Sequence, residues 1–92
     1  MKVEIIRMPK MTIEEFAEQH NITMTVTETA SGKFTAGFKF VREGARQVHS
    51  TPQDTIQNAI AAYAEGISGK ILRVDGVGEV AVPCLTVAGF YE

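Results

Sequence analysis

The chain has 92 residues, of which 45% are hydrophobic and 22% are charged, and its net charge is −2. This length fits one domain with one modest core, and the hydrophobic content excludes a disordered chain. A protein that binds free nucleic acid usually carries a clear excess of Lys and Arg, which nine basic residues against eleven acidic ones do not provide.

The cysteine content and the N-terminus indicate the compartment. A single cysteine, Cys84, excludes an intramolecular disulfide and fits a reducing cytoplasm. The N-terminal segment MKVEIIRMPK has no apolar run of the length that a signal peptide needs. No window approaches the roughly 18 apolar residues of a membrane helix. We therefore expect a cytoplasmic protein that does not bind membranes.

The start of the chain predicts a strand followed by a short helix. Residues 2–7 are rich in β-forming residues, and Val3 and Ile5 alternate with Lys2 and Glu4, which favours a strand. Thr12 and Glu15 have the spacing of a capping box, so we expect a helix from Ile13 to about His20. Asn21 tolerates a left-handed conformation and is expected to end it.

Two alternating segments predict a hairpin at the centre of the chain. Strands are expected over residues 22–29 and 34–40, followed by a turn at 42–44 and a polar strand over 45–50. The positions expected to face inward are Ile22, Met24, Val26, Phe34, Ala36, Phe38 and Phe40. The positions expected on the opposite face are Thr23, Thr25, Thr27, Thr35 and Lys39.

A second helix follows, with a clear start signal. Thr51 is the expected N-cap, Pro52 the first helical residue, and Asp54 lies in the first turn. Gly66 or Gly69 is expected to end this helix. The predicted core consists of Phe16, Val26, Phe38, Ile56, Ile60 and Tyr63, with the Tyr63 hydroxyl near the surface or a partner.

The last third predicts two strands, over residues 70–74 and 78–82, joined by a turn at Asp75–Gly76. The apolar tail, residues 84–92, is expected to be either an added edge strand or a docking segment. The resulting order is β-α-β-β-β-α-β-β in one domain. It indicates an α+β fold, a two-layer sandwich with two helices on one face of an antiparallel sheet of about five strands.

No pattern in the sequence predicts a catalytic, cofactor or metal site. His20 and His49 lack a second ligand at metal-binding spacing. Cys84 has no histidine or acid near it in sequence and is expected to be a small buried hydrophobe. A small enzyme that uses Cys84 or His49 stays an alternative, because catalytic partners need only be close in space.

Two resemblances concern nucleic-acid-binding proteins. The order of elements over residues 12–67 resembles the topology of double-stranded RNA-binding domains. Those domains carry lysines where this chain reads TPQDTIQN, and the aspartate here would repel phosphates. GKFTAGFKF followed by TPQDTIQNAIAAYAE resembles the hairpin and helix of HicB-type antitoxins. A HicB-like antitoxin or small nucleic-acid-binding regulator is therefore one alternative function.

A wider resemblance is to small accessory proteins of tailed phages. The segments that carry it are MTIEEFAEQHNITMTVTE, STPQDTIQNAIAAYAEGISGKIL and VAVPCL, which together span most of residues 11–85. Some proteins of this type are anti-CRISPR proteins, in particular inhibitors of the type I-F CRISPR surveillance complex. The resemblance implies a non-enzymatic protein without a cofactor, which binds this complex in the host cytoplasm and blocks target DNA binding.

Charged residues are the expected contacts with such a complex. A groove that holds DNA is lined by Lys and Arg, and carboxylates compete for these cations through charge-assisted hydrogen bonds. Basic residues are expected to contact the backbone of the guide RNA, and free duplex DNA is expected to bind poorly. The expected partner-binding acids are Glu14, Glu15, Glu18 and Glu28, and the bases are Lys33, Lys39, Arg42 and Arg46.

Overall fold

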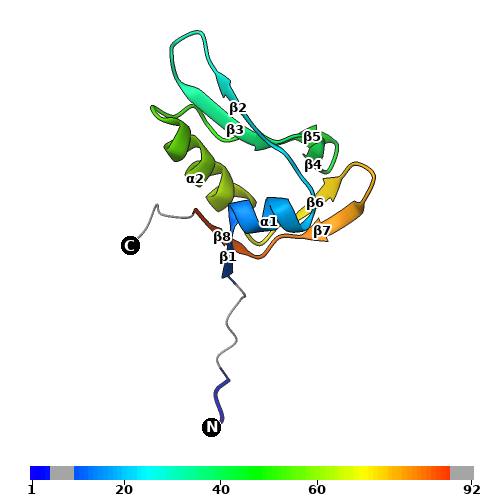
Figure 1. The fold of residues 1–92 in the computed structure, drawn as a ribbon. Coiled ribbons are helices and arrows are strands. Elements are labelled where there is room, and N and C mark those ends of the chain that lie inside the picture. The colour runs from blue at the N-terminus through cyan, green and yellow to red at the C-terminus, as the bar shows by residue number, and fades with distance from the viewer. Residues whose placement is uncertain (5–9, 88–92) are drawn as a thin grey trace.

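The structure, a computed structural model, describes residues 1–4 and 10–87. It confirms the α+β class, but the strands form three small sheets in place of one: a parallel pair, an antiparallel hairpin and a four-stranded antiparallel sheet. Neither described helix is long and apolar enough to cross a membrane. The elements, shown in Figure 1, are β1 (Lys10–Thr12), α1 (Ile13–Gln19), β2 (Met24–Glu28), β3 (Phe34–Phe38), β4 (Val41–Glu43), β5 (Arg46–Gln47), α2 (Ile56–Ile67), β6 (Ile71–Val74), β7 (Gly78–Ala81) and β8 (Cys84–Thr86).

The first helix begins and ends as predicted. The Thr12 hydroxyl accepts from the Glu15 backbone N–H at 3.0 Å, and the Glu15 carboxylate accepts from the Thr12 backbone N–H at 3.2 Å. Both halves of the capping box are therefore formed. Asn21 has a φ of 54°, so the chain leaves the helix through a left-handed residue.

Residues 10–12 and 84–86, far apart in the sequence, meet in the parallel pair. The strand predicted over residues 2–7 is absent at residues 2–4, and residues 5–7 lie outside the described part. β1 instead places Met11 opposite Leu85 of β8. An added strand in the tail is thereby confirmed for β8, while residues 88–92 also lie outside the described ranges.

The alternation in the hairpin predicts the buried face correctly up to Phe38. Val26 stands opposite Ala36, and Phe38 is almost fully buried. The inward position predicted for Phe40 is wrong, since its side chain is 59% exposed. Phe40 has a φ of 61°, a conformation that bulky residues rarely adopt, and this ends the alternation. Val41 is consequently the next buried residue, and it opens β4.

A chain crossing explains why the predicted single sheet is divided. Gln53 and Phe34 exchange two backbone hydrogen bonds of 2.8 Å, so the segment before α2 occupies the outer edge of β3. β4 therefore pairs with β5 and β6 instead. The strand predicted over residues 45–50 is reduced to β5, because the chain beyond it crosses β3.

Gly37 allows this crossing to be close. A Cβ atom there would lie 2.9 Å from the backbone oxygen of Val48, a separation that real Cβ atoms essentially never show. The crossing is also held by Ser50, whose backbone N–H donates to the Ala36 carbonyl at 2.8 Å and whose hydroxyl accepts from the Ala36 N–H at 2.9 Å. The glycine thus has a packing role that alternation does not reveal.

The second helix starts later than predicted. Its N-cap is Thr55, whose hydroxyl accepts from the Asn58 backbone N–H at 3.0 Å. The predicted start at Thr51–Pro52 is wrong because the neighbouring Gln53 is held extended against β3. Gly69, with a φ of 77°, follows the C-terminal cap and ends the helix as expected.

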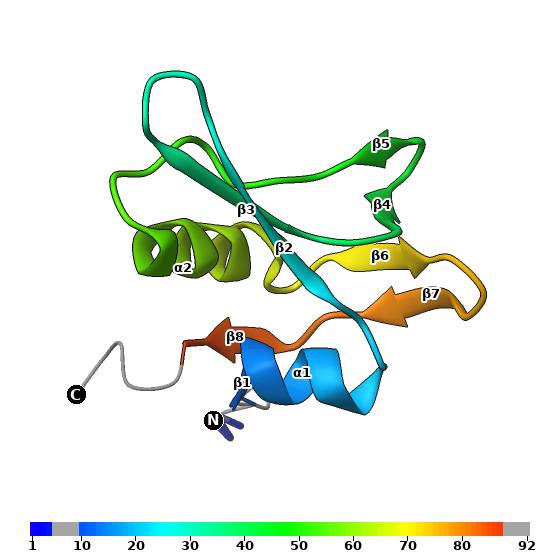
Figure 2. The ribbon, with the colours of Figure 1, turned by 45° about the horizontal axis from the view of Figure 1, so that its top comes forward.

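The core lies where α2 packs on β3 and β8 (Figure 2). Its aromatic centre consists of Phe16, Phe38 and Tyr63, with ring centroids 6.1 Å apart for Phe16 and Phe38 and 5.3 Å apart for Phe38 and Tyr63. Val26 and Ile60 are half-buried beside it. Ile56 is 49% exposed, so its predicted core position is wrong: it lies in the first turn of α2.

The hydroxyl of Tyr63 is not at the surface, which is one of the two places that the sequence predicts for it. It is buried, and among the described residues it has no hydrogen-bond partner of standard geometry. Burial raises the pKa of this hydroxyl, and a hydrogen-bonding contact with the backbone of Phe38, too poor in geometry to satisfy the hydroxyl, partly opposes the rise. A buried polar group without a good partner lowers the stability of the fold. The ring of Tyr63 therefore stabilises the core by packing, while its hydroxyl destabilises it.

Candidate interaction surfaces

The acidic residues of α1 form an exposed face. The helix buries Ile13 and Phe16 against the core, at 1% and 2% exposure. Its spacing then leaves Glu14, Glu15 and Glu18 towards solvent, where the sequence places them. We call these three residues the acidic face.

Within the acidic face, Glu15 has a second role. Its carboxylate closes the capping box, so it already accepts hydrogen bonds from Thr12. Glu15 and Glu18 also line a shallow hollow of about 430 Å³ with Met11 and Gln19. A cationic side chain placed in this hollow would meet two carboxylates above an apolar thioether.

Glu28 does not join the acidic face. It is the last residue of β2, whereas α1 leads into the first residue of the same strand. The tip of the hairpin, next to Glu28, points away from α1 (Figure 1). The structure therefore separates one of the four predicted acidic contacts from the other three.

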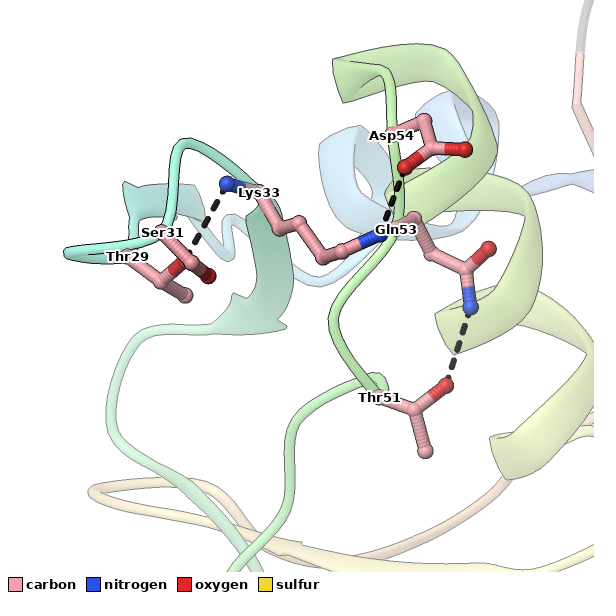
Figure 3. Close-up of polar contacts among 6 residues, drawn as sticks. All are labelled: Thr29, Ser31, Lys33, Thr51, Gln53 and Asp54. Atoms are coloured by element: carbon pink, nitrogen blue, oxygen red, sulfur yellow. Dashed lines mark hydrogen bonds and ion pairs between the residues drawn. The ribbon is translucent and has the colours of Figure 1, made fainter.

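Lys33 is engaged within the chain. Its ammonium lies 2.7 Å from a carboxylate oxygen of Asp54, an ion pair that joins the hairpin turn to the segment before α2 (Figure 3). The hydrogen bond and charge of Lys33 lower the pKa of Asp54. Beside it, Thr29 accepts from the Lys33 backbone N–H at 3.1 Å. Lys33 would have to give up this ion pair to bind a partner.

Lys39 and Phe40 form an exposed pair at the end of β3. The ammonium lies 5.1 Å from the centroid of the Phe40 ring, within the range of a cation–π contact. The left-handed φ of Phe40 is strained for such a residue, and strained positions cluster at functional sites. An exposed aromatic ring beside a cation is a candidate contact for a partner. The alternation pattern instead predicts Phe40 in the core.

Arg42 and Arg46 lie on opposite faces of the β4–β5 hairpin. Arg46 stands opposite Glu43, which also forms a 3.2 Å ion pair with Lys70. Arg42 stands opposite Gln47 on β5 and opposite Arg73 on β6. Sequence reasoning missed Arg73, because only the strand pairing brings it beside Arg42.

The candidates for catalysis lie apart. Cys84 is half-buried and lines a hollow of about 220 Å³ on the α2 side of β8. His49 lines two other hollows, one of about 270 Å³ that includes Thr25, Thr35 and Gln47. His20 caps α1 and packs its ring 4.6 Å from that of Phe16. In the described residues, no group of three His, Cys, Asp or Glu side chains is placed to hold a metal.

Comparison with protein-family models, with curated proteins and with solved structures finds no match to this chain. A functional assignment therefore depends on the surfaces described above and on the resemblance in sequence. Among these surfaces, the acidic face is the one that the sequence predicts and the helix presents as a unit.

Proposed function

We propose that this chain is a non-enzymatic phage inhibitor that binds a host CRISPR–Cas surveillance complex and blocks binding of target DNA. The resemblance of residues 11–85 to small phage proteins suggests this class. The observation that supports it is the acidic face, a compact array of carboxylates on a helix whose other side is fixed in the core. Such an array competes with DNA phosphates for Lys and Arg in a binding groove.

The charge of the whole chain fits this mode of action. A net charge of −2 gives no general attraction to phosphates, so free duplex DNA is expected to bind poorly. An inhibitor of this type acts by occupying a surface in stoichiometric amounts. The bases Lys39, Arg42 and Arg46 are left to contact the guide RNA or the protein surface beside the groove.

The test replaces two acids and leaves the capping residue Glu15 in place. Glu14→Gln/Glu18→Gln is expected to weaken binding to the purified complex about 2- to 30-fold, if each carboxylate contributes about 0.2–1 kcal/mol. Glu4→Gln/Glu65→Gln removes the same charge from exposed positions outside the acidic face and is the matched control. Equal weakening by both variants would contradict the role of the acidic face. No binding of the unsubstituted chain to the complex would contradict the function itself.

A further inference from the structure

Strand pairing brings two arginines side by side on the outer face of the four-stranded sheet. Arg42 of β4 stands directly opposite Arg73 of β6 (Figure 2 shows these strands adjacent). Both side chains are exposed, while Val41 and Val74, the next pair along, are buried on the inner face. Side chains of directly opposed residues are about 4.5–5.5 Å apart at Cβ, and like charges at such positions destabilise a sheet.

In the described residues a single carboxylate, that of Glu79 on β7, stands opposite Arg73, so one acid faces two arginines across the strands. The two ion pairs found there join Lys33 to Asp54 and Lys70 to Glu43, and neither includes Arg42 or Arg73. Two guanidinium groups held in register beside one carboxylate leave a net positive charge, an arrangement that an anion would stabilise. Guanidinium groups present planar pairs of N–H donors that match the oxygens of a phosphate.

The two arginines line one hollow, which has room for an anionic group. It has a volume of about 420 Å³ and is lined by both of them, by Gly44 and Ala45 at the β4–β5 turn, and by Ile71 and Glu79. The small residues at the turn leave space beside the guanidinium groups. Ile71 is 62% exposed and adds an apolar surface at the same place.

We propose that Arg42 and Arg73 bind one phosphodiester group of a single nucleic-acid strand, with the Ile71 side chain against the adjoining sugar or base. A single strand is favoured because its unstacked bases can reach an apolar side chain, whereas a duplex keeps them stacked inside. The site deepens the proposed function and rests on it for one point, the identity of the strand. In the surveillance complex that strand is the guide RNA.

Glu79 sets one boundary of this site. It stands opposite Arg73 on β7, on the side away from Arg42. Its carboxylate repels a phosphate, so the anion lies towards Arg42 and the β4–β5 turn. Removing this charge is therefore expected to tighten binding, an effect that a purely structural role of Glu79 would not produce.

The experiment uses the isolated full chain, so its result does not depend on the surveillance complex. Binding of a short oligouridylate is followed by NMR, with the Nε–Hε signals of the arginines as reporters. Arg42→Gln and Arg73→Gln are each expected to weaken binding about tenfold or more, the loss of a charge-assisted hydrogen bond. Glu79→Gln is expected to strengthen it. Lys10→Gln removes one positive charge from an exposed position on β1, outside the four-stranded sheet, and is the control that is expected to leave binding unchanged.

Two further measurements separate the possible outcomes. The slope of log K against log salt is expected to be about −0.7 for each phosphate neutralised, and to become shallower in Arg73→Gln. Arg42→Gln is expected to melt no lower than the unsubstituted chain, since it relieves the like-charge repulsion with Arg73. A parallel titration with oligothymidylate tells whether the strand is RNA or either nucleic acid.

The proposal is overturned by any of three results. The first is an equal loss of binding in Lys10→Gln, which would indicate unspecific attraction to positive charge. The second is binding of inorganic phosphate but not of either strand, which would indicate an adventitious anion only. The third is no perturbation of the Arg42 and Arg73 signals. Failure here with intact inhibition would refute this site alone, whereas strand binding without inhibition would refute only the proposed function.

Discussion

The buried hydroxyl of Tyr63 gives the sharpest prediction about stability. Tyr63→Phe removes this hydroxyl and keeps the ring, which is 1% exposed and packs edge-on to Phe38. Leaving a buried polar group unpaired costs about 1–3 kcal/mol. We therefore expect Tyr63→Phe to raise the free energy of unfolding by about 1 kcal/mol, a large share of the roughly 5–15 kcal/mol that stabilises a domain.

Urea unfolding at neutral pH measures this change. The dependence of the unfolding free energy on urea is expected to stay constant, since the surface exposed on unfolding is the same. Tyr63→Ala is the sensitivity control, because loss of the whole ring is expected to cost about 3–5 kcal/mol. If Tyr63→Phe is instead less stable by 1 kcal/mol or more, the hydroxyl has a stabilising hydrogen bond, and the description of the core is incorrect.

The same variant predicts a difference at alkaline pH. Burial raises the pKa of Tyr63 in the folded state above its ordinary value of 10.0. Below pH 10 the hydroxyl is protonated in both states, so it adds no pH dependence. Above pH 10 the unfolded state loses this proton first, and the folded state loses stability as the pH rises. The stability advantage of Tyr63→Phe is therefore expected to grow above pH 10, and an advantage that shrinks there would contradict the buried position.

Three further predictions test local features. Gly37→Ala is expected to destabilise the chain by about 1–3 kcal/mol in urea unfolding, because its Cβ would meet the crossing backbone. Gly66→Ala, in open space on α2, is the control and is expected to stabilise the chain by about 0.5–1 kcal/mol. A Gly37→Ala variant more stable than the Gly66→Ala variant would refute the crossing. Thr12→Ala is expected to cost about 0.5–2 kcal/mol in the same assay through loss of the cap, and no change would mean that α1 is held by packing alone. The carboxyl pKa of Asp54, followed by NMR, is expected to lie below 3.8 and to return towards it in Lys33→Met; an unchanged value in that variant would exclude the ion pair in solution.

Local patterns predict those parts of the fold that local interactions determine. The capping box of α1 and the left-handed Asn21 are formed by neighbours in the sequence, and both are found. The late start of α2 is different, because Thr51 and Thr55 are equally suitable caps by composition. The choice between them is made by pairing of Gln53 with Phe34, a contact across 19 positions that no local pattern contains.

The candidate surfaces also differ in whether local sequence or long-range pairing determines them. The acidic face follows from helical spacing within one short segment, so the sequence is sufficient to predict it. The arginine pair depends on the register of β4 with β6, which brings together two residues 31 positions apart in the chain. Its only signal in the sequence is a charged residue, Arg73, on the polar face of an alternating strand. Phe40 was misplaced for a related reason, since a single left-handed residue reverses the alternation after it.

The central claim is that the chain occupies the DNA-binding surface of a surveillance complex, and the order of addition tests it most directly. The chain is added to a purified type I-F complex either before or after target DNA, and bound DNA is measured in a gel-shift assay. The account predicts strong inhibition when the chain is added first and little when DNA is already bound. Equal inhibition in both orders would contradict occlusion, and tight binding of the chain to free duplex DNA would favour a nucleic-acid-binding regulator instead.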